Sequence, residues 1–180
     1  ELTSGSTWHA AGLVATTCCL QGEVPQIILR VGEAAARPIF EAYLDIFGED
    51  YFIEIQDHGI EDQHRVNAVL LKWAKEYNVK VVATNDVHYI EQAHAQAHDA
   101  LMAIQTQTTI DDPHRLRYER PEFYLKSAEQ MKELFAEYPE AIANSIEIAD
   151  RCNLEMEFDK LHLPHYEPPK GKTQTEFLRD

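Results

Sequence analysis

The sequence predicts an α/β fold built on a parallel sheet, because short apolar runs alternate with amphipathic helical patterns. The runs Leu13–Ala15, Tyr51–Ile55 and Val79–Thr84 have the length of buried strands, and each leads into polar residues. Helical patterns over residues 33–47 and 61–77 separate them. Strand, helix, strand, helix, strand at this spacing is typical of parallel strands joined by right-handed crossovers.

The two separating helices are predicted from apolar side chains that recur every three or four residues. The first stripe ends at Phe47, and Gly48 directly after it is a suitable C-cap. The second stripe ends at Tyr77, where Asn78 stops the helix before the third strand.

Further helices are predicted after the third strand. We expect them over residues 91–104, from the capping box Ser127–Gln130 to about residue 137, from Pro139 to about residue 152, and from Thr173 onward. A polar segment, residues 105–120, follows the first of these helices, and a proline-rich stretch precedes the last one. The chain is expected to be frayed at its start and cut, rather than ended, at its last helix.

Composition and charge limit the classes of protein that the chain can belong to. With 44% apolar and 26% charged residues, the chain has the composition of a soluble globular protein. Sixteen basic against thirty-one acidic residues give a net charge of −15, which argues against a nucleic-acid clamp. There is no membrane-spanning run, no signal-peptide pattern and no disulfide framework among the three cysteines. We therefore expect a reducing, cytoplasmic location without a membrane partner.

Metal-capable side chains follow each predicted strand, at the edge where ligands bind in parallel sheets. They are Cys18 and Cys19 after the first strand, Gln56, Asp57 and His58 after the second, and Asn85, Asp86 and His88 after the third. Asp86 and His88 flank a single residue, so in extended backbone they share a face and can offer an oxygen and a nitrogen to one cation. The alternative is that this spacing arises by chance and that the thiol is a small buried hydrophobe.

Two other clusters allow both a functional and a structural interpretation. His94 and His98 lie four residues apart on a predicted helix and could bridge a metal, but surface and packing roles are favoured. Arg115, Arg117 and Arg120 could bind phosphate. The acidic residues 111, 112, 119 and 122 lie as close in sequence, and we favour ion pairs within the chain. The sequence contains no Gly-rich phosphate loop, nucleophile elbow or Cys-x-x-Cys pair.

Four segments, in order, resemble the polymerase and histidinol phosphatase (PHP) domain of bacterial replicative DNA polymerase III alpha subunits. The segments are TTCCLQGEVP at 16–25, YFIEIQDHG at 51–59, VATNDVHY at 82–89 and PEFYLKS at 121–127. The resemblance extends from about Gly12 to Pro164.

The resemblance implies a fold and a set of site residues. The fold would be α/β, a partial distorted (β/α)7 PHP barrel of which this chain holds the last three strands, followed by a helical connector toward the polymerase palm. By motif, Cys19, Asp86 and His88 would be metal ligands, whereas Cys18 matches no ligand position. His58 would lie behind the ligands or face the substrate. The His-x-His strand and other ligand-bearing strands of the family are missing, so the chain alone should bind zinc, manganese or magnesium weakly.

The resemblance also implies a division of the chain into four parts. Residues 1–11 would be a disordered N-terminal stretch, 12–110 the C-terminal part of the PHP barrel, and 111–163 the helical end of the PHP region. Residues 164–180 would be a linker and the start of a segment that leads to the palm.

The implied parent protein is a DNA-directed DNA polymerase that acts on DNA and dNTPs. Its implied partners are other replicase subunits, such as a proofreading exonuclease and a sliding clamp. The PHP site would be a metal-dependent phosphoesterase, with 3′–5′ proofreading exonuclease as one such activity, and the fragment alone would be inactive and bind DNA weakly. The alternative is a non-catalytic structural module that braces the polymerase and docks a separate proofreading subunit. A stand-alone phosphoesterase is disfavoured by the segment from residue 115 to 169.

Overall fold

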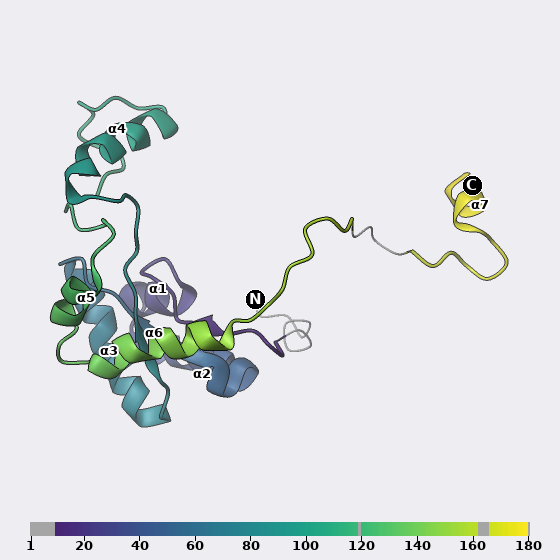
Figure 1. Ribbon diagram of the computed structural model, residues 1–180, viewed down its shortest axis with the longest axis horizontal. Coiled ribbons are helices and arrows are strands. Elements are labelled where there is room, and N and C mark those ends of the chain that lie inside the picture. The colour runs from purple at the N-terminus through teal and green to yellow at the C-terminus, as the bar shows by residue number, and fades with distance from the viewer. Residues whose placement is uncertain (1–9, 119, 162–165, 180) are drawn as a thin grey trace.

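A computed structural model describes residues 10–118, 120–161 and 166–179. Its elements, in chain order, are β1 (Ala15–Thr16), α1 (Glu23–Arg30), α2 (Glu33–Phe47), η2 (Gly48–Asp50), β2 (Tyr51–Ile55), α3 (Glu61–Tyr77), β3 (Val81–Ala83), η3 (Gln92–His94), α4 (Ala95–Gln105), α5 (Ala128–Leu134), α6 (Pro139–Arg151) and α7 (Gln174–Arg179). Figure 1 shows that α4 projects from the body of the molecule and that α7 lies far from it, at the end of an extended segment.

The predicted parallel sheet is confirmed over three strands in the order β1-β2-β3. Ala15 pairs with Tyr51 and Ile53 pairs with Val81, both in parallel register. The outer two strands are shorter than expected. Leu13 and Val14 lie outside the paired part of β1, and Leu13 is 53% exposed. Lys80 and Thr84 flank β3 and still exchange backbone hydrogen bonds with Ile53 and Ile55. The complete barrel that the resemblance implies remains a prediction, as do the four-part division of the chain and the connector.

The hydrophobic core lies between the sheet and helices α2 and α3. Phe40 and Trp73 are fully buried, with ring centroids 5.0 Å apart, and β2 contributes Ile53 and Ile55. Helix α6 packs against β3, where Asn144 donates its side-chain N–H to the carbonyl of Val81 at 2.7 Å. The core thus fixes β2 on both sides, and with it the residues that follow this strand.

Several predicted helix ends are confirmed. Helix α2 ends at Gly48, whose φ of 54° suits glycine, and α3 ends at Asn78, which has a left-handed conformation with φ 55°. Ser127 accepts a hydrogen bond from the backbone N–H of Gln130, completing the predicted capping box of α5. Helix α6 begins at Pro139, as expected. Helix α1 had no counterpart among the predicted elements.

The helix predicted from residue 91 is only partly correct. Residues 92–94 form the 3-10 turn η3, and the α-helix begins at Ala95. The Glu91 side chain and His94 form a reciprocal capping box that closes this turn. His94 and His98 therefore do not share one α-helical face.

An extended segment follows α6 and exposes a row of apolar side chains. Leu154, Met156 and Phe158 are 84%, 64% and 85% exposed, and they alternate with acidic residues. Within the described part of the chain, no helix has both the length and the apolar character needed to cross a bilayer. The expected frayed start falls mostly on residues 1–9, outside the described residues.

Candidate functional site

The carboxylate of Glu54 connects all three strands near their carboxyl ends. Thr16, at the end of β1, donates its hydroxyl to Glu54 Oε2 at 2.6 Å, and Thr84, just after β3, donates to Oε1. Gln56 donates its side-chain N–H to Oε1 at 3.0 Å. This network aligns the three loops that carry the predicted site residues.

A tight turn after β1 places the two cysteines. Cys18 has φ 65° and is exposed, whereas Cys19 is half-buried. The backbone N–H of Gln21 points to Cys19 Sγ at 3.5 Å, and the N–H of Gly22 donates to the Cys19 carbonyl at 2.9 Å. Although the residue is exposed as a whole, partial desolvation of the Cys18 thiol is the largest cause that raises its pKa. The turn therefore holds Cys19, the predicted ligand, at the strand end.

Replacing Gly22 with alanine should disrupt this turn. An added Cβ would lie 2.5 Å from the Thr17 carbonyl oxygen, and that neighbour is backbone rather than a flexible side chain. We expect a loss of about 1–3 kcal/mol in the free energy of unfolding, measured by urea denaturation. Gly12→Ala is a control in which the added Cβ meets nothing within 4 Å, although φ is +82° there. Equal losses in the two variants would contradict the packing argument.

The structure brings Asp86 and His88 together after β3. His88 Nε2 lies 3.3 Å from Asp86 Oδ1, and both side chains are about one-third exposed. The hydroxyl of Tyr118 lies 3.2 Å from the same His88 nitrogen. Burial raises the pKa of Tyr118, and the carboxylate of Asp86 raises it further.

Aromatic rings surround His88 and link it to His58. Phe123 stacks on His58 with centroids 4.3 Å apart and planes 3° from parallel, and it meets His88 edge-on at 5.5 Å. His98, from α4, lies 5.6 Å from His88 and 5.7 Å from the Tyr118 ring. His58 is only 1% exposed, so it lies behind Phe123 rather than at the surface.

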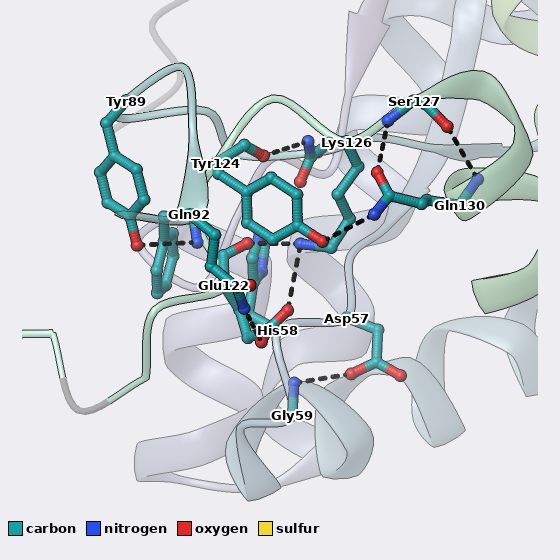
Figure 2. A network of polar contacts seen from close by, with 12 residues as sticks. Asp57, His58, Gly59, Tyr89, Gln92, Glu122, Tyr124, Lys126, Ser127 and Gln130 are labelled. Carbon is teal, nitrogen blue, oxygen red and sulfur yellow. Dashed lines mark hydrogen bonds and ion pairs between the residues drawn. The ribbon is translucent and has the colours of Figure 1, made fainter. Parts of the chain in front are cut away.

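Phe123 belongs to a crossing segment, residues 120–127, that runs alongside residues 88–90. The backbone N–H of His88 donates to the Phe123 carbonyl at 2.8 Å, and that of Leu125 donates to the Tyr89 carbonyl at 3.1 Å. The polar contacts that fix this segment are drawn in Figure 2, where Tyr124, Lys126 and Gln130 lie close together. Gln130 donates to the Tyr124 hydroxyl at 3.1 Å. The crossing segment therefore joins the end of β3 to the start of α5.

Hydrogen bonds assign the tautomer of His58. Gln63 accepts from the His58 backbone N–H at 2.8 Å, so its amide nitrogen faces His58 Nδ1, 2.9 Å away. Nδ1 is then the acceptor and Nε2 carries the proton. That Nε2–H is buried and has no hydrogen-bond partner among the described residues. Burial lowers the pKa of His58, and the positive charge of Lys126 lowers it further, so the ring is neutral.

The described residues do not form a metal cage by themselves. Across residues 10–118, 120–161 and 166–179, no group of three or more His, Cys, Asp or Glu side chains could hold a metal ion. Asp86 and His88 supply an oxygen and a nitrogen donor that suit zinc or manganese, but two donors fall short of the three or four protein ligands of a typical zinc site. The described residues therefore fit part of a metal site and not a whole one.

Sequence reasoning found the acidic and imidazole groups at the strand ends but missed Tyr118, Phe123 and His98 as their neighbours. The sequence marked Phe123 only as part of the motif PEFYLKS and His98 only as a possible partner of His94. No sequence signal marks Tyr118, which lies in an irregular segment. In the arginine cluster, Arg115 forms its ion pair with Asp99, a carboxylate outside the four that the sequence suggested. Arg117 and Arg120 form no ion pair with any described residue.

Comparisons with known proteins show that the chain is similar in sequence to one part of bacterial DNA polymerase III alpha subunits. Residues 6–58 match the PHP domain family. The chain is 41% identical over 178 residues to DNA polymerase III subunit alpha of Thermus aquaticus, covering 96% of this chain and 15% of that protein. It is 41% identical over 162 residues to the same subunit of Treponema pallidum, covering 89% of this chain and 14% of that protein. The corresponding subunit of Campylobacter jejuni is 40% identical, over 96% of this chain and 15% of its own length. The chain therefore spans about one-seventh of the length of these relatives.

Proposed function

The chain is homologous to the part of bacterial DNA polymerase III alpha subunits that includes the PHP domain, and we propose from this that it is a piece of a bacterial replicative DNA-directed DNA polymerase. The parent protein would extend DNA with dNTPs in the cytoplasm. It would work with other replicase subunits, such as a proofreading exonuclease and a sliding clamp. Nucleotide transfer would belong to regions that this chain does not include.

For this segment we propose a share in a metal-dependent phosphoesterase site, with 3′–5′ exonuclease as its activity. The observation that carries the proposal is the Asp86–His88 pair, with the two groups 3.3 Å apart directly after β3. Cys19 would be a third ligand, because it follows β1 at the same edge of the parallel sheet where Asp86 and His88 follow β3. The remaining ligands would come from other parts of the longer protein.

The surrounding residues would orient the two donors. The Tyr118 hydroxyl and Asp86 both contact His88 Nε2, and Phe123 holds the ring from the side. When bound, zinc, manganese or magnesium would activate water and neutralise charge on a phosphodiester. His58 would act through Phe123 as a positioning residue, because it is buried behind that ring.

The test uses the full-length alpha subunit with Asp86→Ala and His88→Ala. We expect each variant to lose at least about 100-fold of 3′–5′ exonuclease rate and part of its bound metal, with polymerase activity within about twofold of the parent. His64→Ala is the matched control for His88→Ala, because His64 also pairs with a carboxylate, Asp57, at 3.1 Å but lies outside the site. Unchanged exonuclease activity and metal content in both site variants would overturn the proposal.

A second candidate is a non-catalytic module that braces the polymerase and docks a separate proofreading subunit. The exposed apolar row of Leu154, Met156 and Phe158 favours it, since such a row fits against another surface. If the module is non-catalytic, the full-length parent protein would have no exonuclease activity of its own, and Asp86→Ala and His88→Ala would lower its melting temperature or its metal content. That result would replace the catalytic proposal with the structural one.

A further inference from the structure

A cleft opens between the start of helix α3 and the segment that leads into the crossing segment. It has a volume of about 600 Å³, and Arg117, Tyr118, Arg120 and Phe123 form one wall. Residues 59–62 form the opposite wall. The cleft shares Tyr118 and Phe123 with the surroundings of His88, so a ligand in it would lie beside the Asp86–His88 pair.

We propose that this cleft binds one nucleotide unit of single-stranded DNA. Arg117 and Arg120 would hold a backbone phosphate, and a base would stack on the exposed part of the Tyr118 side chain. The inference rests on the proposed function, since it names the substrate class and the contacts of that same site. Two arginines beside an exposed aromatic ring are the combination that single-strand binding sites use.

Arg117 and Arg120 differ from their neighbour Arg115 in exposure and in their ion pairs with described residues. Arg115 is bound to both carboxylate oxygens of Asp99, and its side chain is 7% exposed. Arg117 and Arg120 are exposed and pair with no carboxylate within the part of the chain that the structure describes. A guanidinium without a carboxylate partner can offer its forked donors to a phosphate.

Gly59 sets the position of Arg120 in the cleft. A Cβ at Gly59 would lie 3.3 Å from Arg120 Nη1 and 3.4 Å from its Cδ, so the arginine side chain lies directly across this glycine. Gly59 has φ +69°, and its N–H donates to Asp57 Oδ1 at 2.8 Å, as drawn in Figure 2. The bent loop therefore lies against the Arg120 side chain, and the residue as a whole is exposed.

Tyr118 provides the stacking surface and the connection to the Asp86–His88 pair. Its ring has Phe123, His88 and His98 as neighbours, with centroids 4.3, 4.9 and 5.7 Å away, yet the residue is 39% exposed. Its hydroxyl is the group that lies 3.2 Å from His88 Nε2. A base on Tyr118 and a phosphate on the two arginines would thus place the adjoining phosphodiester next to His88.

Glu61 and Asp62 on the opposite wall limit what the cleft can hold. Asp62 is paired with Arg65 at 2.8 Å, whereas Glu61 adds a negative charge at the rim. A second phosphate near this wall would be repelled, in line with the net charge of −15. The cleft therefore suits one nucleotide held weakly, such as a strand end, and not a long stretch of DNA.

The test measures binding of a fluorescent hexathymidylate to the 180-residue chain by anisotropy, with EDTA present to prevent any reaction. We expect a Kd of roughly 10–500 μM at about 25 mM salt. Arg117→Gln and Arg120→Gln should each weaken binding by at least about fivefold. Each should also reduce the slope of the logarithm of the binding constant against the logarithm of the salt concentration by about 1. Tyr118→Ala should weaken binding about 5- to 100-fold, and Tyr118→Phe should retain it, because the stacking ring remains.

Arg30→Gln is the matched control, because it removes the same charge from an exposed arginine at the end of α1, outside the cleft. Circular dichroism of every variant checks that the fold is intact. Binding that is absent, or that falls equally in Arg30→Gln and the two cleft variants, would overturn the inference.

Lower thermal stability in both arginine variants, with hexathymidylate binding unchanged, would overturn it too and would assign the two arginines to contacts within the longer protein. The proposed phosphoesterase function fails separately. If Asp86→Ala loses exonuclease activity but the arginine variants bind hexathymidylate as the parent does, only the proposal about the cleft is refuted. If binding depends on the two arginines but the parent protein has no nuclease activity, only the proposed phosphoesterase function is refuted.

Discussion

Replacing Trp73 with alanine is expected to remove about 3–5 kcal/mol from the free energy of unfolding. Trp73 is fully buried, its ring lies 5.0 Å from Phe40, and Arg37 lies over it at 5.4 Å. Its indole N–H donates to Glu33 at 3.1 Å. Domains are stable by only about 5–15 kcal/mol, so this loss would be a large part of the total. Urea denaturation followed by circular dichroism measures the change.

Trp73→Phe is the control for that variant. It retains an aromatic ring against Phe40 but loses the hydrogen bond to Glu33, which keeps Lys72 at 2.8 Å as a partner. We expect a smaller loss of about 1–2 kcal/mol. If Trp73→Ala lowered the free energy of unfolding no more than Trp73→Phe does, this would contradict the argument that packing of α2 and α3 around this ring stabilises the sheet.

The second large effect is on the pH dependence of stability, through His58. Its pKa is lowered from the ordinary value of 6.5, chiefly by burial and then by Lys126, while Asp86 opposes the shift. As pH falls below about 6.5, His58 in the unfolded chain binds a proton, whereas His58 in the folded chain stays neutral down to its lower pKa. The free energy of unfolding therefore declines with falling pH until the pH passes the folded pKa. A single group contributes a slope of at most about 1.4 kcal/mol per pH unit in that window.

Urea denaturation of the chain between pH 7.5 and 5 measures this slope, with His58→Asn for comparison. Asparagine can place an amide oxygen where His58 Nδ1 accepts from Gln63, but it does not titrate. Burial also lowers the pKa of His98, so that residue contributes a similar slope to both proteins. We expect His58→Asn to be less stable at pH 7.5 and to have a flatter profile. An identical slope in both proteins would rule out His58 as the titrating group.

The fold could be predicted where the sequence pattern alone decides it. Residues 51–55 form a strand with the expected bounds, because this apolar run is covered on both faces. The outer strands are shorter than their apolar runs, since pairing with a neighbour, and not hydrophobicity, determines where a strand ends. The 3-10 turn at residues 92–94 was missed because the side-chain contacts of Glu91 and His94 override the helical pattern.

The candidate site could be predicted only in its local part. Asp86 and His88 are two residues apart, so their proximity follows from the backbone alone. Tyr118 and Phe123 reach His88 through pairing between residues that are far apart in sequence, such as the hydrogen bond from the His88 N–H to the Phe123 carbonyl. Residue spacing carries no information about such pairing. The position of His58 was predicted, but its burial behind Phe123 was not.

The shared ring of Phe123 has an evolutionary consequence. Because this one side chain stacks on His58 and meets His88 edge-on, a substitution at either imidazole changes the space that the ring can occupy beside the other. Mutations at the two histidines should therefore be epistatic, with effects that do not add. In related polymerases, positions 58, 88 and 123 should drift together, so that a relative that has lost one of the three side chains tolerates the loss of the others.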